Sequence, residues 1–183
     1  VLTNLTKRTK CNVYFVVKPV PVVEKVTTAM NSNPSMFATD DPGKNVRYIG
    51  ADPSNYVYFN CSDYSNPTAD TCELWRIIGV FNNVTKGDGS NENLVKIIRV
   101  DSLGKYPWDN KFMGGVIGYG SNDWSTATLQ QDLNSGTYYT TTLKNDTTRN
   151  AIEEVVWNLG GTDDDETSTA SMFYAAERGT TVY

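Results

Sequence analysis

Leu74-Trp75-Arg76-Ile77-Ile78-Gly79-Val80-Phe81 is the stretch of sequence that decides the fold. Its apolar side chains stand at consecutive positions, and consecutive side chains of a β-strand point to opposite faces of the sheet. A strand that is apolar on both faces is typical of the centre of a sheet covered on two sides. The sequence therefore predicts a central strand at Glu73–Asn82 with packing on both of its faces.

Three further runs have the composition of strands and are expected to flank this one: Asn45–Tyr48, Tyr56–Asn60 and Leu94–Asp101. In the last run, Lys96 and Arg99 fall at positions that are expected to meet solvent. The segment Asn83–Asn93 is predicted to form the loop of a hairpin, because it contains the turn-forming residues Lys86-Gly87-Asp88-Gly89-Ser90. This succession of strands and turns favours an antiparallel sheet.

Two helical patterns lie on either side of the strand block. The first ends at Asn33-Pro34, and its apolar face is made of five residues: Val22, Val23, Val26, Ala29 and Met30. In the second, Asp123 or Ser125 can cap a helix that runs through Leu129 and Leu133.

A third helix is expected to begin at Asn145 or Asp146 and to end at Gly160. Its predicted buried stripe consists of apolar residues at helical spacing: Ala151, Ile152, Val155, Val156 and Leu159. Together with the strands, these patterns predict a β-rich α+β fold, in which an antiparallel sheet is backed by two or three short helices.

The aromatic residues fall into two groups. Those in the predicted strands are expected in the core: Tyr56, Tyr58, Phe59 and Trp75. Those near the glycine-rich stretch are candidates for an exposed platform that binds a sugar or a peptide: Tyr106, Trp108, Tyr119 and Trp124. Packing of the second group in a small satellite core is the alternative, and it is the commoner role of aromatic residues in loops.

The cysteines predict one disulfide bond. Cys61 and Cys72 flank a loop of turn-forming residues, Ser62–Thr71, and each adjoins a predicted strand. A bond between them closes a hairpin and stabilises the fold by about 3 kcal/mol. Two buried thiols are the alternative interpretation. Cys11 is left over, and it is either buried or paired with a segment outside this chain.

The composition excludes several classes of function. The chain contains no histidine, which rules out Ser-His-Asp and Cys-His catalysis and zinc sites that use imidazole. Its formal net charge is −5 and its basic residues are scattered, which argues against nucleic acid as a partner. Because no apolar run reaches about 18 residues, no membrane insertion is expected. We therefore expect a protein without catalysis and without a cofactor.

Acidic residues offer two further candidate chemistries. A hydrolase that works with two carboxylates is the enzymatic alternative, and its candidate residues have no spacing that favours them: Asp101, Asp109, Asp123 and Glu177. Calcium is a candidate ligand for an acidic run and for a turn: Asp163, Asp164, Asp165 and Glu166, and Asp88–Asn93. Neither segment fits the twelve-residue EF-hand pattern, so solvated loops are the favoured interpretation and no metal is expected.

Seven motifs occur in an order that resembles an uncharacterised family of predicted surface proteins of gut-type Gram-positive bacteria. They cover the chain from about residue 10 to its end: Tyr48-Ile49-Gly50, Asn55–Cys61, Trp75–Val80, Asn122–Ser125, Leu129–Leu133, Trp157–Gly161 and Ala176–Tyr183. In that family the last motif continues into a C-terminal module that is similar to the C-type-lectin or formylglycine-enzyme fold. The resemblance implies that the sheet and helices here correspond to the first half of such a fold.

The resemblance also implies an extracellular or cell-surface location and a division of the chain. Residues 1–23 are expected to be a β arm, the end of a preceding β-sandwich, and residues 24–183 the main α+β domain. Val1 in place of a starting Met is interpreted as the start of a processed or trimmed product.

Two hypotheses about function follow. The first is an adhesion or ligand-binding module that binds a carbohydrate or a protein on a surface. The second is a structural subunit of a filament or pilus that shares strands with copies of itself. The apolar run Val13–Val17 and the unfinished strand Thr180–Tyr183 favour the second hypothesis, because isolated strands need partners.

Overall fold

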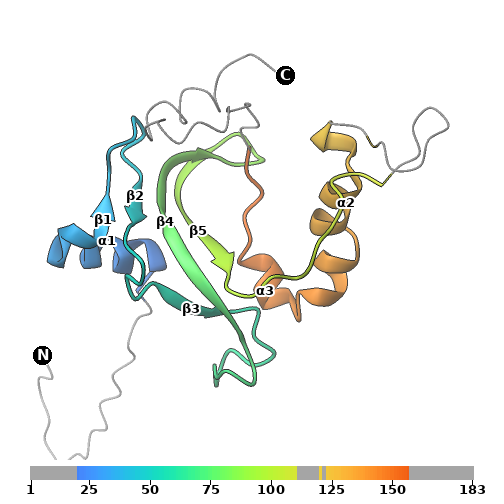
Figure 1. Cartoon of the computed structure of the whole chain (residues 1–183), viewed down its shortest axis with the longest axis horizontal. Helices are drawn as coiled ribbons and strands as arrows, with labels where there is room; N and C mark the ends of the chain where they lie inside the picture. Colours follow the sequence, from blue (N-terminus) through green and yellow to red (C-terminus); the bar gives the residue numbers. More distant parts are fainter. Residues whose placement is uncertain (1–19, 111–119, 121–122, 157–183) are drawn as a thin grey trace, which may run out of the picture.

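The computed structural model describes residues 20–110, 120 and 123–156. It contains a five-stranded antiparallel sheet and several short helices, which confirms the predicted α+β fold (Figure 1). The strands are β1 (Phe37–Ala38), β2 (Val46–Tyr48), β3 (Tyr56–Phe59), β4 (Glu73–Thr85) and β5 (Asn91–Arg99). β4 and β5 form a long curved pair in the middle of the molecule.

β4 is the central strand, as the sequence predicts, but the predicted packing on both of its faces is wrong at one end, where Leu74 is 39% exposed. It pairs with β2 through Val46 and Val80, with β3 through Tyr56 and Arg76, and with β5 along most of its length. Gly79 lets β2 approach closely, because a Cβ atom at this position would lie 2.1 Å from the carbonyl oxygen of Val46.

The loop predicted at Asn83–Asn93 is wrong in its extent. Both strands continue into this segment, and only a tight turn at residues 86–90 joins them. The ladder is irregular near Asn83, and pairing resumes at Val84 and Glu92. Asn83 takes a positive φ of 55°, and its backbone N–H donates to the Oδ1 atom of Asn93 at 2.9 Å.

The first predicted helix is confirmed as α1 (Val22–Ser32), which covers part of the sheet. A buried cluster joins α1 to four strand residues and is called the packed core below: Val26, Phe37, Val46, Ile77 and Val80. Three other residues of the predicted apolar face pack against this cluster: Val23, Ala29 and Met30. The helix ends where the backbone N–H of Asn33 donates to the carbonyl of Ala29.

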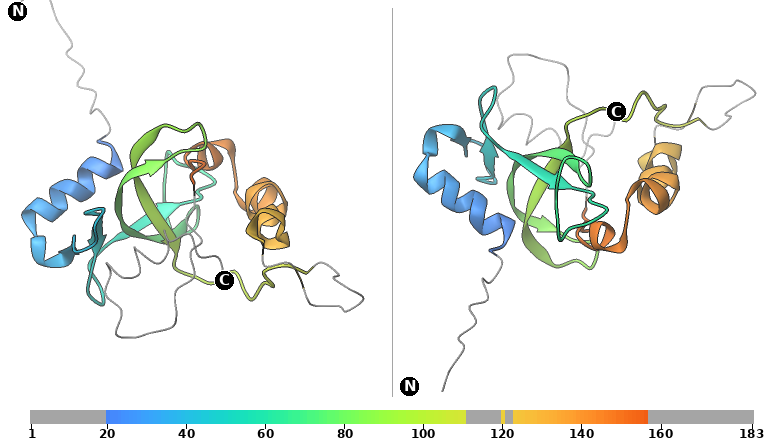
Figure 2. Two further views of the ribbon diagram at one scale, coloured as in Figure 1. Left: turned by 90° about the horizontal axis from the view of Figure 1, so that it is seen from above. Right: turned by 90° about the horizontal axis from the view of Figure 1, so that it is seen from below.

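The other helical segments are short: η1 (Pro34–Met36), η2 (Trp124–Thr126), α2 (Thr128–Asn134), the π-helical η3 (Tyr138–Thr142) and α3 (Asp146–Asn150). α2 and α3 lie on the opposite side of the β4–β5 pair from α1, as all three views show (Figures 1 and 2). The predicted cap of the third helix is confirmed at Asn145, whose side chain accepts a bond from Thr148. The predicted cap of the second helix is wrong, because Asp123 caps the separate turn η2, and α2 begins after Ala127 without a side-chain cap.

The predicted extension of the third helix toward Gly160 is wrong. Two residues of its expected buried stripe are largely exposed, Ile152 at 47% and Val156 at 58%. The helix stops because the following residues pair with the end of β4. The backbone N–H of Val156 donates to the carbonyl of Thr85, and the N–H of Gly87 donates to Glu154, each at 2.8 Å. Leu159 and Gly160 lie outside the described residues.

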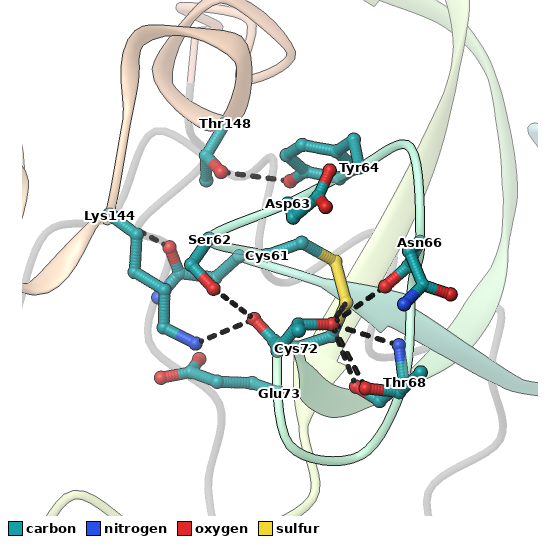
Figure 3. Close-up of a disulfide and its surroundings, with 12 residues drawn as sticks. Cys61, Ser62, Asp63, Tyr64, Asn66, Thr68, Cys72, Glu73, Lys144 and Thr148 are labelled. Atoms are coloured by element: carbon teal, nitrogen blue, oxygen red, sulfur yellow. Dashed lines mark hydrogen bonds between the residues drawn. A yellow bond between two sulfur atoms is a disulfide. The ribbon is translucent and has the colours of Figure 1, made fainter.

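The predicted disulfide between Cys61 and Cys72 is confirmed, and it joins the neighbouring strands β3 and β4 (Figure 3). The fully buried Asn60 ties this hairpin to the helical segments. Its Nδ2 group donates to the carbonyl of Thr142 at 2.9 Å, and its Oδ1 atom accepts from the backbone N–H of Lys144 at 2.8 Å. The disulfide therefore closes the hairpin itself, and the hydrogen bonds of Asn60 join the hairpin to the end of η3 and to Lys144.

Lys96 and Arg99 of β5 meet solvent only in part, and each also contacts a neighbour on β4. The Nζ atom of Lys96 lies 4.2 Å from the ring centre of Phe81, and the guanidinium of Arg99 pairs with Glu73 at 3.1 Å. Long basic side chains can lie along apolar surface in this way.

Two predictions about the ends of the chain stay predictions. Residues 1–19, with Cys11 and the run Val13–Val17, lie outside the described part, and so does Thr180–Tyr183. In the part that the structure describes, no helix has the length and apolar character needed to cross a membrane.

Candidate ligand-binding site

The structure brings together two of the four aromatic residues proposed as a platform. The ring centres of Trp108 and Trp124 lie 4.7 Å apart, with the ring planes tilted by 45°. Trp108 is 41% exposed, whereas Trp124 is half-buried. Tyr106 is exposed two residues before Trp108, and Tyr119 lies outside the described residues. We call Trp108 and Trp124 the tryptophan pair.

Trp108 is held from the start of α2. Its carbonyl accepts a bond from the backbone N–H of Leu129 at 3.1 Å. The next residue, Asp109, is buried, and its Oδ1 atom accepts from the backbone N–H of Thr128 at 3.2 Å and from the Thr128 hydroxyl at 2.6 Å. Gly120 packs so closely on Asp109 that a Cβ atom there would lie 2.4 Å from the Asp109 Cβ. These contacts fix the backbone that carries Trp108.

Trp124 is held by a cap of its own. The Oδ1 atom of Asp123 accepts from the backbone N–H of Ser125 at 2.9 Å and from its hydroxyl at 2.7 Å. The carbonyl of Trp124 accepts from the N–H of Ala127 at 3.2 Å, and Ala127 is fully buried. The short η2 turn is therefore anchored on both sides of the indole.

The tryptophan pair has the chemistry of a binding surface for neutral molecules. An indole ring has a broad apolar face with one N–H donor, so it can stack on an apolar surface and form a hydrogen bond at its edge. Asp109 and Asp123 are the sequence neighbours of Trp108 and Trp124, and their carboxylates accept bonds from Thr128 and Ser125. The pair is thus an aromatic surface, and the acid next to each ring in the sequence accepts hydrogen bonds from a neighbouring backbone N–H and hydroxyl.

The candidate acids of a hydrolase have different environments. Asp109 and Asp123 carry out the structural roles described above, and Asp101 is exposed. Glu177 lies outside the described residues. The carboxylate-dependent hydrolase therefore stays an untested alternative.

The calcium candidates remain without support. Asp163, Asp164, Asp165 and Glu166 lie outside the described residues. In the turn between β4 and β5, the carboxylate of Asp88 accepts bonds from the hydroxyl and the backbone N–H of Ser90, and these bonds lower the pKa of Asp88. Across residues 20–110, 120 and 123–156, no three acidic or cysteine side chains gather as a metal site would need.

Trp75 belongs to a structural cluster at one end of the sheet. Its indole Nε1–H donates to the carboxylate of Glu73 at 3.2 Å, and its ring lies edge-on to Phe59 with 5.4 Å between centres. Glu73 also pairs with Arg99. Burial, and then the nearby negative charge of Glu73, raise the pKa of Tyr138 from η3. Trp75 therefore has a structural role, because its indole N–H and its ring are both in contact with neighbouring strand residues.

The prediction that all the strand aromatics are buried is wrong for two of them. Tyr56 and Tyr58 are exposed, whereas Phe59 and Trp75 are half-buried. The sequence does contain a signal for this exposure, because Tyr56 and Tyr58 alternate with Val57 and Phe59. A period of two puts the tyrosines on one face of β3 and the apolar pair on the other.

Comparisons of the chain with protein-family models, with curated proteins and with solved structures find no match. The function of the chain is therefore inferred from its own residues.

Proposed function

We propose that this chain is an extracellular, non-enzymatic ligand-binding module of the adhesion type, and that the tryptophan pair binds carbohydrate. One observation carries the proposal. Trp108 keeps 41% of its surface exposed, although its carbonyl is bonded to Leu129, the next residue Asp109 is bonded to Thr128, and its ring contacts Trp124.

Energetics favour binding as the role of this exposed ring. A tryptophan that served only the core would gain stability from full burial, since its large apolar surface is removed from water there. A ring that is already held in place loses less conformational entropy when a ligand binds, so the free-energy cost of binding is lower. Trp is also over-represented among the residues that contribute most to binding energy.

Carbohydrate is the ligand class that this chemistry favours. The apolar C–H face of a sugar ring can stack on an indole, and a sugar hydroxyl can accept a hydrogen bond from the indole N–H. No bound charge is needed, and the acids beside the pair are already hydrogen-bonded to Thr128 and Ser125. The Cys61–Cys72 disulfide supports the extracellular part of the proposal, because such bonds persist mainly in oxidising compartments.

A glycan array probed with the labelled full chain tests this proposal. We expect binding to neutral oligosaccharides, with an affinity reduced about tenfold or more by Trp108→Ala, equivalent to about 1.4 kcal/mol or more. Trp108→Phe should retain part of the affinity, since it keeps an aromatic face. Tyr58→Ala is the matched control, because it removes an exposed aromatic ring from a different part of the surface. An array without any bound sugar, or binding that Trp108→Ala leaves unchanged, would contradict the proposal.

The filament hypothesis is the second candidate, and one observation favours it. β5 pairs with β4 alone in the described part of the chain, so its other edge presents backbone N–H and C=O groups. An open edge of this kind is a template for an added strand from another chain. The run Cys11–Val17 of a neighbouring copy is the candidate strand, because it is apolar and is followed by Pro19 and Pro21.

Electron microscopy of the native protein, with and without residues 1–17, tests the second candidate. Regular filaments that disappear on deletion, while the remaining chain stays folded and monomeric, are the expected result of strand sharing. A deletion that unfolds the chain would contradict it, because the strand would then belong to its own core.

A further inference from the structure

One face of the sheet carries a patch of exposed apolar side chains. Five large apolar residues on β3, on β4 and at the end of β5 are between 39% and 55% exposed: Tyr56, Tyr58, Leu74, Ile98 and Val100. Monomeric proteins seldom leave such a group contiguous unless it binds something. We call these residues, together with Arg76, the open face.

The strand register puts these six residues on the same face in two rows. Tyr56 lies opposite Arg76, and Arg76 lies opposite Ile98. In the next row, Tyr58 lies opposite Leu74, and the backbone N–H of Val100 donates to the carbonyl of Leu74 at 3.0 Å. Because the rows are two residues apart on each strand, their side chains point to the same side.

Arg76 stands at the centre of one row and is held in place. Its Nε–H donates to the Oδ1 atom of Asn55 at 3.1 Å, and its guanidinium carbon lies 5.5 Å from the ring centre of Tyr56. Asn55 is itself buried, and its Nδ2 group donates to the carbonyl of Ile77 at 2.5 Å. Among the described residues, no bond engages the two terminal nitrogens of Arg76.

A fixed guanidinium with its terminal nitrogens open is a receptor for a carboxylate. The two N–H groups form a fork that matches the two oxygens of a carboxylate, and apolar surroundings strengthen the resulting pair. The neighbours of Arg76 in the open face are aromatic or aliphatic. The complementary ligand is therefore a carboxylate flanked by apolar side chains.

The size of the open face limits the kind of ligand. Three strands about 4.8 Å apart and two rows about 7 Å apart cover far less than the area of a standard protein interface. A short peptide segment fits this area, whereas a globular surface would need more. A second copy of the chain is disfavoured, because a two-fold contact would bring two Arg76 side chains together with no acid on the open face to offset them.

We infer that the open face binds a short peptide segment of a protein partner, with one carboxylate on Arg76 and apolar side chains over Leu74, Ile98 and the two tyrosines. This function is separate from carbohydrate binding by the tryptophan pair, since none of these residues belongs to that pair.

An array of short synthetic peptides tests the inference with the full chain. Each acidic peptide carries a central Asp or Glu between Leu, Ile, Val, Phe or Tyr residues. A matched amide peptide has the same sequence with Asn or Gln in place of the acid. We expect acidic peptides to bind and their amide partners to bind about tenfold more weakly or worse. Arg76→Gln should remove this preference, and Arg76→Lys should restore little of it because the fork is lost.

Lys25→Gln is the matched control, since it removes one exposed positive charge from α1. It should leave the binding unchanged. Ile98→Ser is a second variant of the same surface, in case the Arg76 variants fail to fold. Ile98 is exposed, so shortening its side chain should leave the fold intact. This variant should weaken binding of all the peptides. Binding that is indifferent to both Arg76→Gln and Ile98→Ser, or no binding at all, would overturn the inference. Dimers that Leu74→Ser dissociates would also overturn it and would identify a second copy as the occupant.

Discussion

β4 belongs to two regions that use apolar side chains in opposite ways. In the packed core, its residues Ile77 and Val80 are buried under α1 with Val26. On the open face, Leu74 of the same strand is exposed beside Arg76. The two sets are adjacent in sequence, so a run of apolar residues does not by itself distinguish a side chain that stabilises the fold from one that is available to a ligand.

This contrast has an energetic consequence. Shortening a side chain of the packed core removes buried contacts and leaves a cavity, which lowers the free energy of unfolding. Shortening a side chain of the open face exposes little that was hidden, so it should affect binding and leave stability nearly unchanged. The predictions below test whether the boundary between the two regions lies where the structure has it.

The largest effect is expected at Phe37 in the packed core. Its ring is buried and its centre lies 4.3 Å from that of Tyr48. Phe37→Ala should lower the free energy of unfolding by about 3–5 kcal/mol, measured by urea denaturation. Phe37→Leu keeps more of the volume and should cost clearly less. Equal and small losses in both variants would mean that this region is not the main core.

The disulfide should rank second. Cys61 and Cys72 close a loop with a sequence separation of 11. Replacing both by Ser should lower the free energy of unfolding by about 3 kcal/mol, because the unfolded chain gains conformational freedom. Intact-mass measurements with and without reductant provide the control, since they report the oxidised pair in the parent chain. Two thiols that alkylate freely before reduction would contradict the bond itself.

Asn60 should have an intermediate effect. Asn60→Ala leaves the carbonyl of Thr142 and the N–H of Lys144 without their present partners. It also puts Ala at a φ of 50°, a left-handed backbone conformation that Ala adopts less readily than Asn. We expect a loss of about 1–3 kcal/mol in the free energy of unfolding. Asn60→Gly is the matched variant, because it relieves the backbone and removes only the side-chain bonds. If the two variants match the parent chain, the junction does not depend on Asn60.

The smallest effect is expected on the open face. Ile98→Ser should change the free energy of unfolding by less than about 0.5 kcal/mol. Ile77→Ser, in the packed core, is the comparison variant and should be strongly destabilising. A loss at Ile98 that approaches the loss at Ile77 would show that the open face is covered in the folded protein.

The sequence predicts the sheet better than it predicts the segments around it. β4 and its partners are identified because long apolar strands bounded by turn residues leave few alternatives, and α1 because its apolar residues repeat at helical spacing. The third helix is predicted too long because Val155 and Val156 also suit a strand, and pairing with Thr85 and Gly87 decides between the two. That contact is distant in sequence and has no local signal.

The binding surfaces are predicted only in part. Residue type alone identifies the tryptophans as candidates, yet their contact depends on the Asp109–Thr128 bonds, which bring a loop to the start of α2. The sequence does not predict the open face as a binding surface, although Tyr56 and Tyr58 alternate with Val57 and Phe59. Whether another element covers a strand face is a property of the whole fold, so alternation identifies the face and leaves its exposure undetermined.

The most direct test of carbohydrate binding is an NMR titration that follows the indole N–H resonances. The chain contains 4 tryptophans, so each indole signal can be assigned by substitution and observed separately. On addition of the oligosaccharide that binds best on the array, the signals of Trp108 and Trp124 should shift and saturate together. The signal of Trp75, whose N–H donates to Glu73, should stay in place. If the Trp108 signal does not shift at a saturating oligosaccharide concentration, or if only the Trp75 signal shifts, the account is contradicted.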